Sequence, residues 1–199
     1  SERSRGLGDV YKRQVPTQPS PTVLAGEGGH ADFAPVDAQE IAVLNCLMER
    51  FGRVSYERLL SGAGILAIYE ALAQLSSRIP EHQSPEDIYD AAIAGVDTLA
   101  MRTVQLFCRV LGSFAGNMAL TVGAKGGVYI AGGIAAKILP ILAASDFRHR
   151  FESKGRLRSY LADIPLYVVT ASDTGLRGAA QFLSTRSQGH LTRTTYEGK

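Results

Sequence analysis

The chain has 199 residues, of which 45% are hydrophobic and 20% are charged, and its formal net charge is +2 at pH 7. These values fit one globular domain, or one and a half, and argue against wholesale disorder. The near balance of charge leaves no basic stripe, so nucleic acid is not an expected partner. Glycines, a lysine and a proline interrupt the longest apolar stretch, residues 128–144, so we expect no membrane partner either.

The first residues differ in composition from the rest. Residues 1–14 are basic and lack the apolar core of a secretory signal, and three prolines follow within residues 15–22. Proline blocks helix formation and favours an extended chain. We therefore expect residues 1–22 to be a disordered leader that is foreign to the domain over residues 23–190, with a natural basic tail as the alternative. The polar end, residues 191–199, is expected to fray.

Apolar residues then recur at helical spacing. Asp37 is the expected N-cap of a first helix that ends at Gly52, and its apolar positions are Ile41, Leu44, Leu47 and Met48. A short helix is predicted after Ser55, another after the glycine loop 61–64, and a further one at Ser84-Pro85, a strong start signal.

The longest predicted helix runs from about Asp97 to Leu120 and carries a wide apolar face. Gly112 and Gly116 lie on one side of it, and each costs about 1 kcal/mol in helix propensity. Close approach of another backbone explains why glycine stands there. The two cysteines, Cys46 and Cys108, lie far apart within apolar helical patterns. They indicate two buried thiols in a reducing, cytoplasmic setting.

The periodicity changes after this helix. Residues 128–131 form a short β-branched and aromatic run between glycines, and residues 166–170 form a second one. Helices are predicted over 134–144 and 176–184. Strand and helix alternate with long crossovers, which is typical of an α/β protein with a parallel or mixed sheet covered by helices.

Three polar or glycine-rich segments could carry chemistry. In GEGGHADF, glycines surround Glu27 and His30, a carboxylate and an imidazole suited to the hydroxyls of a polyol or sugar. A plain glycine-rich turn is the alternative. Glu57 begins a predicted helix, where a solvated or capping carboxylate is the ordinary reading. Gly132-Gly133 joins a strand to a helix, where a nucleotide could bind, although mere turn chemistry is commoner. No P-loop or Rossmann fingerprint occurs.

Taken together, the chain resembles the bacterial glucokinases that lack zinc. The resemblance is carried, in order and spacing, by GEGGHADFAP, SYERLLSGAG, GGVYIAGGI and DIPLYVVTASDTGLRGAA. It implies an α/β fold, namely the large lobe of a hexokinase- and actin-like (ribonuclease H-like) kinase, helix-rich with a small mixed sheet. It also implies transfer of the ATP γ-phosphoryl group to the 6-hydroxyl of glucose in glycolysis, with Mg²⁺. The cysteine cluster of the related zinc-binding sugar kinases does not follow His30, so no metal site is expected.

Site residues follow from the resemblance position by position. It implies that Glu27, His30 and Glu57 bind the hydroxyls of glucose. Gly132 and Gly133 would lie against the adenosine end of ATP, and the glycines Gly62 and Gly64 resemble those of the nucleotide cleft.

Other features of the family are missing from the chain. We find neither the Asn-Asp pair that supplies the catalytic base nor the two glycine-rich phosphate loops, and Asp32 does not match the catalytic position. The expectation is a C-terminal large-lobe fragment that is inactive alone. A non-enzymatic sugar or nucleotide sensor on the same fold is the alternative, and a homodimer is left open.

Overall fold

A computed structural model describes residues 13–15, 22–24 and 26–188. They fall into two units, one extending to Val169 and one beginning at Thr170. The second unit contains α10 (Thr174–Gln188), which lengthens the predicted helix 176–184 at both ends. The expected frayed tail over 191–199 lies outside the described residues.

The first unit is mainly helical, as the apolar periodicity predicted. Its first half contains η2 (Gly28–His30), α1 (Ala38–Phe51), α2 (Tyr56–Leu59), α3 (Gly62–Leu75), α4 (Pro85–Ala94) and α5 (Thr98–Val122). Its second half contains β3 (Val128–Ile130), α6 (Gly133–Lys137), α7 (Leu139–Ala144), α8 (Phe147–Glu152), η3 (Gly155–Leu157), α9 (Arg158–Ala162) and β4 (Leu166–Val168).

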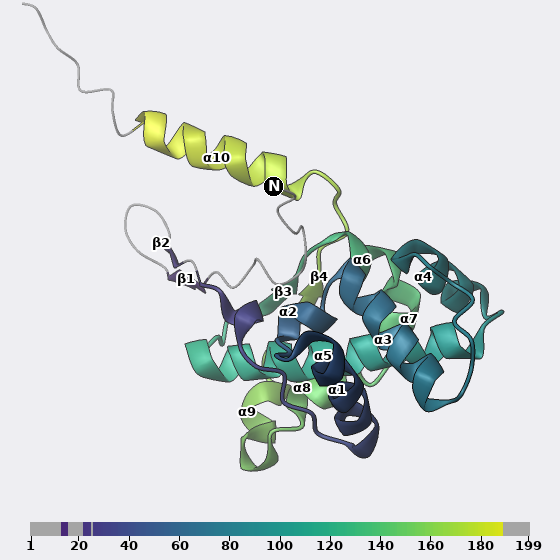
Figure 1. Cartoon of the computed structure of the whole chain (residues 1–199). Helices are drawn as coiled ribbons and strands as arrows, with labels where there is room; N and C mark the ends of the chain where they lie inside the picture. Colours follow the sequence, from purple (N-terminus) through teal and green to yellow (C-terminus); the bar gives the residue numbers. More distant parts are fainter. Residues whose placement is uncertain (1–12, 16–21, 25, 189–199) are drawn as a thin grey trace, which may run out of the picture. The chain divides into compact units, whose positions relative to one another are not determined.

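The central helix α5 organises the core. Asp97 caps it by accepting a hydrogen bond from the Leu99 amide at 2.7 Å, and Gly123, with φ of 62°, ends it in the left-handed conformation. Figure 1 shows α5 crossing the unit, and it packs most extensively on α8, α4 and α3. Both predicted glycines face α8: a Cβ on Gly112 or Gly116 would collide with the carbonyl oxygen of Phe147 or Phe151. The predicted close backbone approach is confirmed.

The sheet is small within the described residues. β3 and β4 pair in parallel, with Val128 opposite Leu166 and Ile130 opposite Val168, as the crossover between them predicted. A second pair lies near the start of the chain, where β1 (Arg13–Val15) and β2 (Thr22–Leu24) are antiparallel. Residues 13–15 of the expected disordered leader therefore form a strand, because β2 supplies a hydrogen-bonding partner. Residues 1–12 and 16–21 lie outside the described part.

The buried face of α1 agrees with the predicted one only in part. Leu47 is buried and Leu44 packs against the core as predicted, whereas Ile41 and Met48 are 49% and 48% exposed. Val43 and the charged Glu40 are buried instead. Cys46 is only half-buried, so the prediction of two buried thiols is correct only for Cys108.

A buried ion-pair network holds Glu40 in place. Arg150 of α8 donates to Glu40 Oε1 at 2.7 Å, to Asp37 Oδ2 at 3.2 Å and to Ser113 Oγ at 3.0 Å. The other Glu40 oxygen accepts from the Val36 amide at 2.8 Å. A buried charge needs such partners, and here they join the start of α1 to α5 and α8.

The helix predicted over 134–144 is broken in two. Pro140 lies in the first turn of α7, where its ring and missing N–H cannot continue α6, so the break falls at Ile138. No single helix among the described residues is long and apolar enough to span a membrane; α4 and α5 reach that composition only as a pair bent by 105°.

Candidate functional site

Two segments that lie far apart in sequence meet at the surface of the first unit. The Phe33 amide donates to the Val54 carbonyl and the Tyr56 amide to the Ala31 carbonyl, both at 3.0 Å. These bonds flank an antiparallel bridge between Asp32 and Ser55. The bridge brings the GEGGHADF and SYER segments together. The three residues that the resemblance assigned to glucose, Glu27, His30 and Glu57, therefore lie on neighbouring stretches of backbone.

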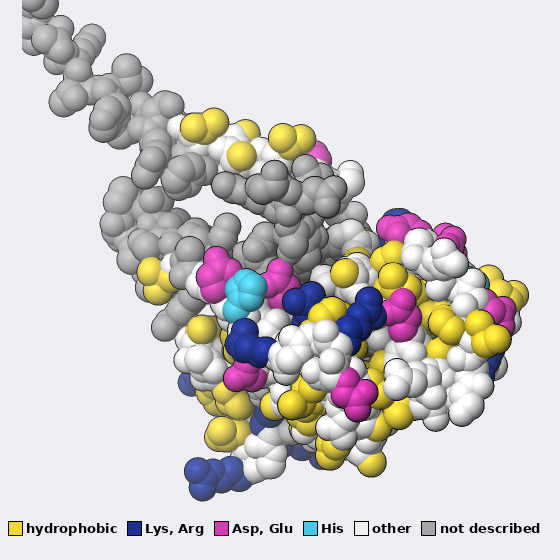
Figure 2. Space-filling model, in the orientation of Figure 1, with side chains coloured by type: hydrophobic (Ala, Val, Ile, Leu, Met, Phe, Trp, Pro, Cys, Tyr) yellow, Lys and Arg dark blue, Asp and Glu magenta, His cyan; other side chains and the backbone are white. Residues whose placement is uncertain are grey.

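The glycine-rich segment folds into the turn η2. Glu27 precedes it, and the His30 amide closes it by donating to the Glu27 carbonyl at 3.0 Å. Gly29 is buried beneath the turn, while the Glu27 and His30 side chains are exposed. In Figure 2 acidic side chains lie on both sides of the histidine exposed on this face. The turn thus presents polar groups outward on a compact backbone.

His30 and Glu57 form the central pair of the site. His30 Nε2 lies 2.9 Å from Glu57 Oε2, and the two side chains are 59% and 17% exposed. Ser55 caps α2, as predicted, by accepting from the Arg58 amide at 3.3 Å, which fixes the first turn that carries Glu57. An imidazole donates and accepts, and a carboxylate accepts from two hydroxyls at once. The pair can therefore bind a polyol from the solvent side.

Tyr56 anchors the site to the core. It is 3% exposed. Its ring stacks on Phe114 of α5 with centroids 4.4 Å apart and meets the edge of Phe33 at 5.7 Å. Asn117 Nδ2 donates to its hydroxyl at 3.1 Å. Burial raises the pKa of Tyr56 above its usual value, so the hydroxyl stays protonated and is a poor candidate for an acid or base.

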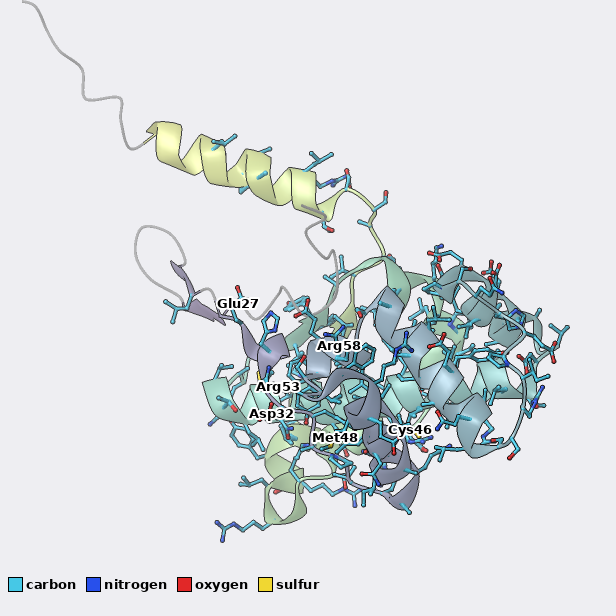
Figure 3. The ribbon with its side chains drawn as sticks, viewed as in Figure 1. Glu27, Asp32, Cys46, Met48, Arg53 and Arg58 are labelled. Atoms are coloured by element: carbon cyan, nitrogen blue, oxygen red, sulfur yellow. The ribbon has the colours of Figure 1, made fainter. Side chains whose placement is uncertain are left out.

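Arg53 and Asp32 lie beside the pair and were not predicted as a unit. Arg53 Nε donates to Asp32 Oδ1 at 2.8 Å, and its terminal NH2 donates to the His30 carbonyl oxygen. In Figure 3 the two labelled side chains lie next to each other below Glu27. Arginines before helices are common on surfaces, so nothing in the sequence singles out Arg53. Asp32, which does not match the catalytic position of the family, is held in place by this contact.

The glycine turn after β3 combines a strained and an unstrained position. Gly132 has φ of 124°, which side-chain-bearing residues rarely adopt, so the turn itself requires glycine there. Gly133 has no such φ, and a Cβ there meets no described atom within 4 Å. Both residues are exposed. Local structure therefore explains the first glycine and leaves the second without a packing reason.

The other two glycines of the predicted nucleotide cleft lie at the start of α3. A Cβ on Gly64 would collide with the Leu59 carbonyl oxygen, so the close packing of α3 on α2 explains that residue. A Cβ on Gly62 would make ordinary contact with Pro85 at 3.6 Å. Contact of either with a nucleotide remains a prediction.

The helix after the glycine turn is fastened to α4. Lys137 Nζ donates to the Tyr89 hydroxyl at 2.9 Å and lies 4.8 Å from the centre of that ring. This hydrogen bond raises the pKa of Lys137 above its usual value.

In the described part of the chain, no group of three or more His, Cys, Asp or Glu side chains is arranged to hold a metal ion.

Comparison with solved structures defines the class of fold. A glucokinase from an Antarctic psychrotroph superposes with a TM-score of 0.79 and 35% identity, over 86% of this chain and 53% of that one. A glucokinase from Balamuthia mandrillaris in complex with glucose gives 0.69 at 19% identity, over 77% of this chain and 45% of that one. The fold is that of the sugar kinases, as the resemblance implied.

Sequence comparison identifies the family within that class. The glucokinase family model matches residues 5–186, a range that begins inside the expected leader. Glucokinases from Hahella chejuensis and Tolumonas auensis are 51% and 48% identical over 160 residues, 80% of this chain and 50% of each relative. The chain belongs to the glucokinase family, and it spans about half the length of these relatives.

Proposed function

We propose that this chain serves the ATP-dependent phosphorylation of glucose at its 6-hydroxyl and supplies the hexose-binding side of that reaction. The observation that carries the proposal is the His30–Glu57 pair, 2.9 Å apart with the imidazole exposed, on two segments joined by backbone hydrogen bonds. Family membership and the glucose named with the Balamuthia mandrillaris structure support it. The reaction belongs in a cytoplasmic, glycolytic setting.

In this proposal the sugar lies over η2 and the start of α2. Glu27 and Glu57 accept hydrogen bonds from sugar hydroxyls, while the imidazole of His30 bridges the Glu57 carboxylate and the ligand. Groups fixed by backbone bonds and by the buried Tyr56 hold the hexose in one orientation, which is what in-line phosphoryl transfer requires.

ATP is proposed to approach the glycine turn after β3. The absence of any described atom near a Gly133 Cβ leaves room for the adenosine end, and Gly132 shapes the turn. Mg²⁺ would be held mainly by the phosphates of ATP and would neutralise the charge that develops on them. No residue of this chain was matched to the base of the family or to its phosphate loops, so the proposal assigns neither function to a residue here.

The test of the hexose site is glucose binding by this chain, observed by ligand NMR at millimolar sugar. His30→Ala and Glu57→Gln each leave a polar partner unsatisfied, so we expect about fivefold to 150-fold weaker binding, the equivalent of ~1–3 kcal/mol. His149→Ala, an exposed histidine of α8, is the matched control and should bind as the parent does. Unchanged binding in both site variants contradicts the proposal.

A further inference from the structure

Arg53 contacts the chain beside the Asp32–Ser55 bridge, at the Asp32 carboxylate and at the carbonyl of His30. Its guanidinium donates through Nε to Asp32 Oδ1 at 2.8 Å and through Nη2 to the His30 carbonyl. Nη2 also lies 2.7 Å from the same Asp32 oxygen. A planar arginine fork fixes geometry as well as charge, which a lysine ammonium does not do.

These bonds act on the orientation of His30. Its carbonyl group is bound to Arg53, and its amide closes η2 on Glu27, so both ends of the residue are fixed. The side chain between them reaches Glu57 on the other segment. Without Arg53, the His30 carbonyl loses its side-chain hydrogen bond, and the turn is held at this end by backbone contacts: the Ala31 amide donating to the Gly28 carbonyl at 3.1 Å, and the bridge.

Global stability does not account for this arrangement. The side chains of Arg53 and Asp32 are 62% and 78% exposed, and exposed ion pairs contribute little to unfolding free energy. Because Arg53 also binds the His30 carbonyl, we expect its loss to affect the η2 turn rather than the unfolding free energy. Holding binding groups in their bound geometry before the ligand arrives increases affinity, because the ligand no longer has to order them.

We infer that Arg53 is a positioning residue of the hexose site, which holds the His30 turn in register with Glu57. The inference rests on the proposed function of that pair. Arg53 contacts no sugar itself in this account; it acts through the carbonyl of His30 and the carboxylate of Asp32.

The experiment compares Arg53→Ala and Arg53→Lys with Arg50→Ala. Arg50 is a matched control because it is also exposed and paired with a carboxylate, Glu70, but it joins α1 to α3. Two quantities are measured on the whole chain: hydrogen exchange of the His30 and Ala31 amides, and the glucose dissociation constant.

For Arg53→Ala we expect faster exchange at both amides, glucose binding weakened by roughly two- to fivefold, and an unchanged thermal midpoint. In Arg53→Lys the same two amides should exchange as fast as in the alanine variant, because a lysine ammonium does not reproduce the planar fork of arginine. Arg50→Ala should change neither quantity.

The two measurements separate the possible failures. If the His30 and Ala31 amides of Arg53→Ala exchange as slowly as in the parent, Arg53 does not hold the turn, whatever the glucose dissociation constant. Faster exchange with unchanged glucose affinity overturns the positioning role. If the parent chain does not bind glucose, or if His30→Ala binds it as well as the parent does, the proposed function fails and the inference falls with it. The exchange rates still show in that case whether Arg53 holds the His30 turn.

Discussion

At the residue scale, two adjacent glycines have different reasons for being glycine. Gly132 has φ of 124°, a conformation that the turn after β3 imposes and that a side chain resists. Gly133 is the N-terminal residue of α6 and has open space around a Cβ within the described structure. The first is explained by the backbone and the second by the proposed nucleotide.

Substituting each glycine tests this difference. Gly132→Ala should lower the unfolding free energy by about 1–3 kcal/mol, because the strained φ remains. Gly133→Val should leave the thermal midpoint near that of the parent but weaken ATP binding, because its side chain occupies the space assigned to adenosine. Thermal denaturation and nucleotide titration measure the two effects. A Gly133→Val chain that is destabilised yet binds ATP normally removes Gly133 from the site.

At the element scale, the contact between α5 and α8 depends on the absence of side chains. Gly112 and Gly116 let the backbone of α8 approach, and the buried Arg150 of α8 then reaches Glu40 of α1 and Ser113 of α5. The close approach and the ion-pair network therefore support each other. Three helices that lie far apart in sequence are joined at one place.

Alanine substitutions distinguish packing from helix propensity. Gly112→Ala favours the helix by up to about 1 kcal/mol but collides with the Phe147 carbonyl, so we expect a net loss of about 1–3 kcal/mol. Gly178→Ala in α10 is the control, since a Cβ there meets no described atom within 4 Å. It should leave the urea midpoint unchanged or raise it. A Gly112→Ala chain as stable as the parent would show that α8 can move aside.

At the scale of the whole molecule, one buried carboxylate links stability to pH. Burial by itself raises the pKa of Asp97, but hydrogen bonds from the Leu99 and Ala100 amides and the Tyr69 hydroxyl, together with the charge of Arg78, hold it below its usual value. A lowered folded-state pKa contributes stability that is present above the unfolded value of about 3.9. This contribution is lost as the pH falls through the folded value.

The corresponding prediction concerns acid denaturation. Asp97→Asn keeps an N-cap but loses the charge, so we expect it to be about 1–3 kcal/mol less stable at neutral pH. Its free energy of unfolding should also decline less than that of the parent as the pH falls below about 4. Urea titrations over this range measure both effects, with the exposed Asp163→Asn as control. Parallel pH profiles for parent and Asp97→Asn contradict the assignment.

Catalytic turnover is also a property of the whole molecule. We expect from the sequence that this chain lacks the base and both phosphate loops of the family, and loss of a base alone typically costs about 10²–10⁴-fold in rate. We therefore expect the 199-residue chain to phosphorylate glucose far more slowly than ~1 s⁻¹, the lower end for kinases. A coupled assay with glucose and ATP measures this. A rate above that value would show that residues of this chain supply the missing groups.

The sequence by itself determined what depends on neighbouring residues. The caps at Asp37, Ser55 and Ser84, the alternation of strands and helices, and the need for glycine in α5 all follow from local backbone chemistry. The order of its motifs identified the family and made Glu27, His30 and Glu57 candidates for one sugar site. These features need no knowledge of distant contacts, which is why a pattern of residue types is enough to predict them.

Only the tertiary structure decided which distant groups meet. Glu40 is buried with Arg150, 110 positions away, as its ion-pair partner, whereas the neighbouring apolar Ile41 is exposed. Arg53 meets Asp32, 21 positions away, because a backbone bridge aligns their segments. Periodicity ranks positions by hydrophobicity and contains no information about a charge partner on another element. Such pairings arise only when the chain has folded.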